Sequence, residues 1–127
     1  QLKKIKRISI IRNKNFNRYQ KNLNQFWTQN SRLKLVSSFG YATFVQNRLE
    51  VFKYLKSKNI QTRPLICGNM GQQPFWRKKS KNSSQLPNAE FINKYGLYLP
   101  NHANLSFEDI DYICKNFNHC AKAIFFK

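Results

Sequence analysis

Arg63 and Asn69 are the two residues of this sequence best suited to bind a polar ligand. Arg63 lies in a short apolar run, and Asn69 follows Gly68 in a turn directly after that run. A guanidinium group binds phosphate or carboxylate through paired hydrogen bonds, whereas an amide can both donate to and accept from sugar hydroxyls. Both residues also have a structural interpretation, because Arg63 could form an internal ion pair and Asn69 could occupy a left-handed turn position.

Aromatic residues could complete such a binding edge. Phe39 precedes Gly40, and Phe75 and Trp76 follow a proline. Their rings could pack against the face of a sugar or a base, or they could belong to the hydrophobic core. For Phe75 and Trp76 we favour the core.

The residue types that catalysis needs form no recognisable constellation. All of the acidic residues fall near the start of a predicted helix, where the helix dipole stabilises negative charge. They are Glu50, Glu90, Glu108, Asp109 and Asp111. His119-Cys120 lacks the further ligands of a zinc site, and we expect His119 to be a cation at a helix C-terminus. The sequence therefore predicts neither catalytic residues nor a metal site.

The bulk properties limit where the protein works. Three cysteines cannot all pair within one chain, and none forms a Cys-x-x-Cys motif, so we expect reduced thiols. There is no run of about 18 apolar residues, and the basic start is followed by polar residues where a signal peptide would be apolar. The sequence predicts a cytoplasmic protein that does not associate with a membrane.

The formal net charge of +18 would attract polyanions such as nucleic acids. However, Lys, Asn, Ile and Phe are abundant together, which is typical of a genome rich in A and T, and Asn contributes nothing to a charge-driven function. The basic residues are also spread along the whole chain. We therefore expect only non-specific nucleic-acid binding, and a basic nucleic-acid-binding domain remains the alternative from another functional class.

The first half of the chain predicts a long helix, a strand and a second helix. Residues 2–27 carry apolar side chains at three- and four-residue steps, from Ile5 to Phe26. Residues 33–46 alternate like a strand, and Gly40 indicates a bulge or a close backbone approach. Residues 47–58 predict a helix that Asn47 caps with Glu50 as its capping-box partner, and Asn59 suits the left-handed position after it.

The second half predicts a strand over residues 60–67, a loop without periodicity over 70–85, and a short helix between Pro87 and Gly96. A strand at 97–99 follows. Ser106 and Asp109 form a capping box for the last helix, whose apolar stripe is Phe107, Ile110, Ile113 and Phe117. This order predicts an α/β (α+β) fold in which a small sheet has helices packed on one face.

Four segments together resemble the C-terminal small domain of the DegT/DnrJ/StrS family of pyridoxal-phosphate-dependent nucleotide-sugar aminotransferases and dehydratases. They are Ile60 with Thr62-Arg63, Gly68-Asn69 with Gln73-Pro74, Leu86-Pro87-Asn88-Ala89-Glu90, and residues 97–105. The resemblance implies the C-terminal domain of a fold-type I enzyme, with a linking helix over residues 1–29 and an α/β subdomain over 30–127. Gln1-Leu2 matches the start of the family's linking helix, so we expect the N-terminal cofactor-binding domain to lie upstream of this chain.

The resemblance also implies partners. The full enzyme would use pyridoxal or pyridoxamine phosphate, none of it bound by this chain alone, and would work as a homodimer with active sites at the subunit interface. Its substrate would be a nucleotide-linked 4-keto-6-deoxy sugar in deoxysugar or polysaccharide biosynthesis, including that of lipopolysaccharide. Arg63, Asn69, Phe39 and His102 are the expected substrate-binding residues. His102 joins this set because the family has a polar or His-containing turn there.

Two alternatives stay open within this resemblance. Cys67-Gly68-Asn69 and Ser38-Phe39-Gly40 are more similar to the branch that dehydrates the sugar at carbon 3 than to the aminotransferases. The deciding cofactor-site position, His in one branch and Lys in the other, lies outside the chain. A truncated remnant without activity is the third interpretation.

Overall fold

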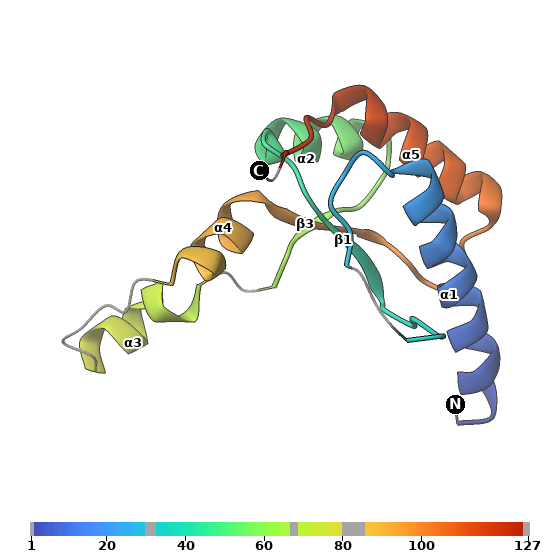
Figure 1. Ribbon diagram of the computed structural model, residues 1–127, viewed down its shortest axis with the longest axis horizontal. Helices are drawn as coiled ribbons and strands as arrows, with labels where there is room; N and C mark the ends of the chain where they lie inside the picture. The colour runs from blue at the N-terminus through green and yellow to red at the C-terminus, as the bar shows by residue number, and fades with distance from the viewer. Residues whose placement is uncertain (1, 30–32, 67–68, 80–85, 126–127) are drawn as a thin grey trace.

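A three-stranded antiparallel sheet in the order β1-β3-β2 organises the chain (Figure 1). The computed structural model describes residues 2–29, 33–66, 69–79 and 86–125. The elements are η1 (Leu2–Lys4), α1 (Ile5–Asn22), β1 (Gly40–Phe44), α2 (Arg48–Ser57), β2 (Arg63–Pro64), η2 (Met70–Gln72), α3 (Pro74–Lys79), α4 (Pro87–Tyr95), β3 (Gly96–Pro100) and α5 (Phe107–Cys120).

One face of the sheet is buried under helices. Tyr41 of β1 lies opposite Leu99 of β3, Thr43 lies opposite Leu97, and all four are buried. Apolar side chains of α1, α2 and α5 form one cluster with this face, and Figure 1 shows these three helices together at one end of the molecule. The predicted small sheet with helices packed on one face is therefore confirmed.

The other face is covered at one end and open at the other. Side chains alternate along a strand, so Phe44 points away from the core face. Its ring stacks on Trp27 at 4.4 Å and meets Phe91 of α4 at 5.3 Å. Phe44 lies opposite Gly96 in the register. The face is thus covered by aromatic rings near the start of β3 and stays open toward Pro100.

The long N-terminal helix is shorter than predicted. It ends at Asn22, whereas the periodicity continues to residue 27. Asn118 of α5 donates a hydrogen bond to the Asn22 carbonyl at 3.1 Å, so a contact distant in sequence satisfies the helix end. Phe26 is buried as expected, but Ile5 is 54% exposed and lies outside the core.

Two predicted strands are much shorter in the structure than the sequence indicates. The predicted strand over 60–67 is reduced to Arg63–Pro64, because Pro64 has no N–H to donate and Ile66 turns the chain with a φ of 56°. The predicted strand region that starts at residue 33 becomes a strand only at Gly40, and Leu33 is 74% exposed.

The predicted loop over 70–85 contains η2 and α3, so that prediction is wrong for the described part. Phe75 and Trp76 lie on α3 and are exposed, which overturns our preference for a core role. Figure 1 shows η2 and α3 extending away from the helices of the core. Residues 80–85 and the Cys67-Gly68 turn lie outside the described residues.

The helix-end predictions succeed where the signal is local. Asn59 has a φ of 59°, and Ser106 and Asp109 form the predicted capping box of α5. The capping box at Asn47 is wrong: its side-chain oxygen instead accepts from the Lys122 N–H at 2.9 Å, and its amide donates to the Cys120 carbonyl at 2.8 Å. Asn47 therefore joins the start of α2 to the end of α5.

Candidate functional site

A cavity of about 620 Å³ lies where β3 ends, between the edge of the sheet and the first turns of α5. Phe39, Arg63 and His102, three of the predicted substrate-binding residues, line it together. The other lining residues are Gly40, Lys58, Asn59, Ile60, Gln61, Tyr98, Leu99, Pro100, Leu105, Asp109, Tyr112 and Ile113. We call this cavity the β3 cavity. Its volume falls within the range of about 300–1,000 Å³ that ligand pockets occupy.

Arg63 reaches the β3 cavity because of the strand register. It lies opposite Tyr98, so both side chains share the face that points away from the helical core. Arg63 is exposed, and in the described part of the chain it makes no ion pair or hydrogen bond that would support the alternative structural interpretation. Its guanidinium group is therefore available for an anionic ligand.

Phe39 and Tyr98 form an aromatic pair beside Arg63. Their ring centroids are 5.2 Å apart with planes tilted by 49°, and Phe39 is 67% exposed. Gly40 makes this arrangement possible, because a Cβ at that position would lie 3.0 Å from Tyr98 Cδ1. The close approach that the sequence predicted at Gly40 is confirmed, and Tyr98 is a cavity residue that the sequence analysis missed.

Buried amides hold the segments that carry Phe39 and His102 against α1. Asn101 is fully buried and donates to the Ser38 carbonyl at 3.0 Å and to the Arg12 carbonyl at 3.3 Å. Asn15 of α1, also buried, donates to the His102 carbonyl at 3.4 Å. His102 itself is exposed at the rim. α1 thus fixes both backbone segments that frame the β3 cavity.

Asn69 lies at the opposite end of β3. The Leu65 N–H donates to the Gly96 carbonyl at 3.1 Å, so the chain after β2 leaves the sheet at the Gly96 end. Asn69 is 2% exposed, and its side-chain oxygen accepts from the Gly71 N–H at 2.9 Å as the cap of η2. Its φ of −82° is not left-handed. The structure therefore separates Asn69 from the other three predicted residues and gives it a turn-forming role, while substrate contact there stays a prediction.

The charge around the β3 cavity is mainly positive or neutral. Asp109 lines it, but its carboxylate accepts from the Ser106 N–H at 2.8 Å in the capping box. Lys58 also lines the cavity, but its ammonium group makes a cation–π contact with Tyr54, with Nζ 5.5 Å from the ring centroid. Tyr112 donates to the Lys58 carbonyl at 3.4 Å and so joins α5 to the turn after α2. Arg63 is left as the cation most available to a ligand.

The described residues do not fit a covalent pyridoxal-phosphate site. A Schiff-base lysine needs a desolvated or otherwise activated amine, and every lysine whose side chain the structure describes is exposed. No three His, Cys, Asp or Glu side chains in the described ranges are grouped to hold a metal ion. Over the same ranges, no helix is both long and apolar enough to span a membrane.

The described residues form a small α/β domain with a cavity at one end of its sheet. The chain belongs to the DegT/DnrJ/EryC1/StrS aminotransferase family, whose model matches residues 1–118. A comparison with curated protein sequences finds no match.

Solved structures share this fold. A DegT/DnrJ/EryC1/StrS aminotransferase from Brucella abortus matches 93% of this chain with a TM-score of 0.82 and 20% identity. GDP-4-keto-6-deoxy-D-mannose-3-dehydratase from E. coli, with bound hydrated pyridoxal phosphate, matches 91% with a TM-score of 0.78 and 26% identity. A variant of a GDP-4-keto-6-deoxymannose-3-dehydratase with bound GDP-perosamine has the same coverage of this chain, TM-score and identity. The chain spans about a third of these proteins, 32% of each.

Proposed function

We propose that this chain is the substrate-binding small domain of a pyridoxal-phosphate-dependent enzyme that acts on a nucleotide-linked 4-keto-6-deoxy sugar. The observation that supports the proposal most directly is the β3 cavity, in which Arg63 lies opposite the half-buried Tyr98, whose ring packs against the exposed Phe39. A cation next to exposed aromatic rings suits a ligand that has both phosphates and ring faces. His102 at the rim would add a polar contact.

The small domain's part would be to bind and orient the substrate and to exclude water. The cofactor, when bound in the whole enzyme, supplies an electron sink for carbanion chemistry. Because the described residues of this chain do not fit that cofactor, we place no reaction step on them. We further propose a homodimer in the cytoplasm, engaged in deoxysugar or polysaccharide biosynthesis.

Within this class we favour the 3-dehydratase over the aminotransferase. The Cys67-Gly68-Asn69 and Ser38-Phe39-Gly40 segments support that branch, and so does the 26% identity to the E. coli dehydratase. An assay of the complete enzyme on GDP-4-keto-6-deoxymannose separates the two. With glutamate present as amino donor and reductant, a dehydratase would release a 3-deoxy-4-keto sugar, whereas a product that carries the amino group on the sugar itself would assign the aminotransferase.

Arg63→Ala in the complete enzyme tests the site. Loss of a charge-assisted contact should cost about 1.5–3 kcal/mol, seen mainly as a higher KM. Arg63→Lys should rescue only part of this loss, because a lysine cannot form the paired hydrogen bonds. Arg7→Ala, which removes an exposed arginine of α1, is the matched control. If Arg63→Ala lowers the melting temperature and leaves KM unchanged, Arg63 is a scaffold residue and the proposed site is wrong.

A further inference from the structure

We infer that a set of buried polar side chains between α1 and the end of β3 positions one wall of the β3 cavity. The set consists of Asn15, Tyr19 and Asn101, and we call it the polar seam. The wall that it positions carries Phe39 and His102. The inference rests on the proposed function and deepens it, because it assigns positioning residues that do not themselves line the cavity.

Two side chains of α1 reach the chain where it leaves β3. The Tyr19 hydroxyl donates to the Pro100 carbonyl at 2.7 Å, and the Asn15 amide donates to the His102 carbonyl at 3.4 Å. Both donors are buried, and Figure 1 shows the chain running from β3 to α1 before α5 begins. β3 ends at Pro100, so hydrogen bonds from α1 replace the strand ladder in holding the path of the chain beyond it.

Asn101 completes the polar seam from the other side. Its side chain is fully buried, and its amide donates to the Arg12 carbonyl of α1 at 3.3 Å and to the Ser38 carbonyl at 3.0 Å. One side chain therefore joins α1, the end of β3 and the segment before β1. Hydrogen bonds weaken steeply when their distances or angles change, so this amide fixes how the three segments lie relative to one another.

The side chains on the wall next to the polar seam are not held in place by burial. Phe39 is 67% exposed although its ring contacts Tyr98, and His102 is exposed at the rim. A side chain that buries little area gains little from packing, so the backbone of its own segment decides where it lies. Because the polar seam binds the carbonyls of Ser38 and His102, it decides the position of both exposed side chains.

The opposite wall of the β3 cavity is held independently. Arg63 and Tyr98 are paired across β2 and β3, and the Leu65 N–H donates to the Gly96 carbonyl at 3.1 Å. These contacts belong to the sheet and involve no residue of the polar seam. The polar seam therefore sets the spacing between the two walls, and a ligand that contacts both walls depends on it.

Hydrogen exchange of the 127-residue chain, measured by NMR, tests the positioning role without any ligand. The Leu105 amide reports on the wall next to the polar seam, because it donates to the His102 carbonyl at 3.2 Å, and the Leu65 amide reports on the opposite wall. Tyr19→Phe removes one hydroxyl and keeps the ring. It should speed exchange at Leu105 about 2- to 10-fold, the value of one hydrogen bond, without changing Leu65. Asn101→Ala, which removes two hydrogen bonds, should have the larger effect.

Val51→Ala is the matched control for these variants. Val51 is a fully buried core residue of α2, so its truncation destabilises the domain and removes no hydrogen bond of the polar seam. The ratio of the exchange rates at Leu105 and Leu65 should stay as in the wild type. Equal acceleration at both amides in Tyr19→Phe and Asn101→Ala would show that the polar seam only stabilises the domain as a whole, and would overturn the inference.

Steady-state kinetics of the complete enzyme show whether the wall matters for the substrate. Tyr19→Phe should raise KM for the nucleotide sugar about 2- to 10-fold and leave kcat unchanged, because it weakens binding to a displaced wall and touches no reacting group. Asn101→Ala should raise KM further. Val51→Ala should change neither constant of the folded enzyme.

The inference and the proposed function can fail separately. A complete enzyme that converts a nucleotide sugar in an Arg63-dependent way, yet keeps its KM in Tyr19→Phe and Asn101→Ala, would keep the function and refute the positioning role. A complete enzyme that converts no nucleotide sugar would refute the function, while faster exchange at Leu105 without a change at Leu65 would support the positioning role.

Discussion

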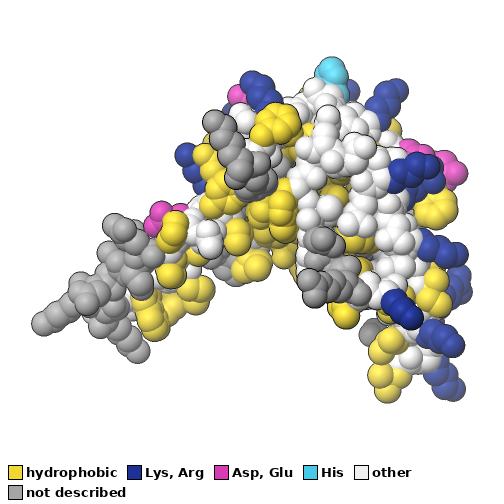
Figure 2. Space-filling model, viewed as in Figure 1, with side chains coloured by type: hydrophobic (Ala, Val, Ile, Leu, Met, Phe, Trp, Pro, Cys, Tyr) yellow, Lys and Arg dark blue, Asp and Glu magenta, His cyan; other side chains and the backbone are white. Residues whose placement is uncertain are grey.

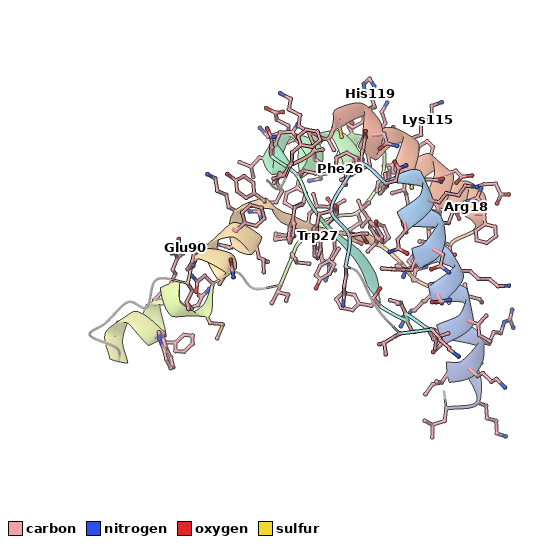
Figure 3. All side chains as sticks on the ribbon, viewed as in Figure 1. Arg18, Phe26, Trp27, Glu90, Lys115 and His119 are labelled. Carbon is pink, nitrogen blue, oxygen red and sulfur yellow. The ribbon has the colours of Figure 1, made fainter. Side chains whose placement is uncertain are left out.

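Asp111 shows how a single carboxylate ties two helices together. Arg18 Nε of α1 donates to Asp111 of α5 at 2.8 Å, Asn22 donates to the same carboxylate at 2.8 Å, and Figure 3 shows Arg18 projecting from α1 toward α5. The hydrogen bond from Arg18 holds the pKa of the Asp111 carboxyl below its ordinary value. A depressed folded-state pKa stabilises the fold above the unfolded pKa of about 3.9, and this contribution is lost as the pH falls through the folded value.

Asp111→Asn should therefore lower the melting temperature at pH 7, and the difference from the wild type should shrink as the pH falls below about 4. Thermal unfolding followed by circular dichroism between pH 2 and pH 8 measures this. Glu90→Gln, an exposed acid on α4 away from Arg18, is the control. A difference that does not change with pH would show that the ion pair contributes nothing.

Asn101 is a buried residue whose side-chain amide joins two backbone segments. Its amide satisfies two carbonyls, and removing it would leave both without this donor in a dry environment. We expect Asn101→Ala to reduce the free energy of unfolding by about 1–3 kcal/mol. Asn104→Ala, an exposed asparagine of the same turn, should change it by less than about 0.5 kcal/mol. Urea unfolding of both variants measures the two changes in the free energy of unfolding. Equal changes would contradict the role given to Asn101.

The helix α5 separates two phenylalanines that the sequence placed in one apolar stripe. Phe117 is fully buried and meets Phe26 at 4.9 Å, but Phe107 is 42% exposed and lies under the Arg18 guanidinium at 4.7 Å. Phe117→Ala should cost about 3–5 kcal/mol, and Phe107→Ala should cost about 0.5–1 kcal/mol, the value of an exposed cation–π contact. Denaturant unfolding of the two variants provides the comparison. Similar losses would restore the predicted stripe.

These elements show which parts of the fold the sequence could predict. The Ser106 cap and the left-handed Asn59 depend on neighbours within a few residues, and both predictions are confirmed. Other features depend on residues far away in the chain and cannot be predicted from a local pattern. They are the length of β2, the end of α1 and the exposure of Phe107. For the cavity, the same reasoning found Arg63 and Phe39 and missed Tyr98, because strand register brings Tyr98 beside them.

At the scale of the whole molecule, the positive charge is spread over the surface, and four of the five acidic side chains accept hydrogen bonds. In Figure 2 the Lys and Arg side chains lie along α1 and over the end of the molecule formed by α2 and α5. Asp109 and Asp111 bond within α5 or to α1, Glu90 accepts from Gln72 at 3.0 Å, and Glu50 accepts from Asn47 at 2.8 Å. Only 5 acidic residues oppose 23 basic ones, so the chain should attract any polyanion.

Any nucleic-acid binding by this chain should accordingly be weak in sequence preference and steep in salt dependence. The charge is diffuse, and no base-reading motif accompanies it. Fluorescence titrations with several unrelated duplexes and single strands at two ionic strengths would measure both properties. We expect affinities that differ little between sequences and fall sharply with added salt, because each neutralised phosphate releases counterions. A preference of about 4 kcal/mol or more for one sequence, the scale of specific binders, would favour the nucleic-acid-binding domain over the enzyme domain as the function of this chain.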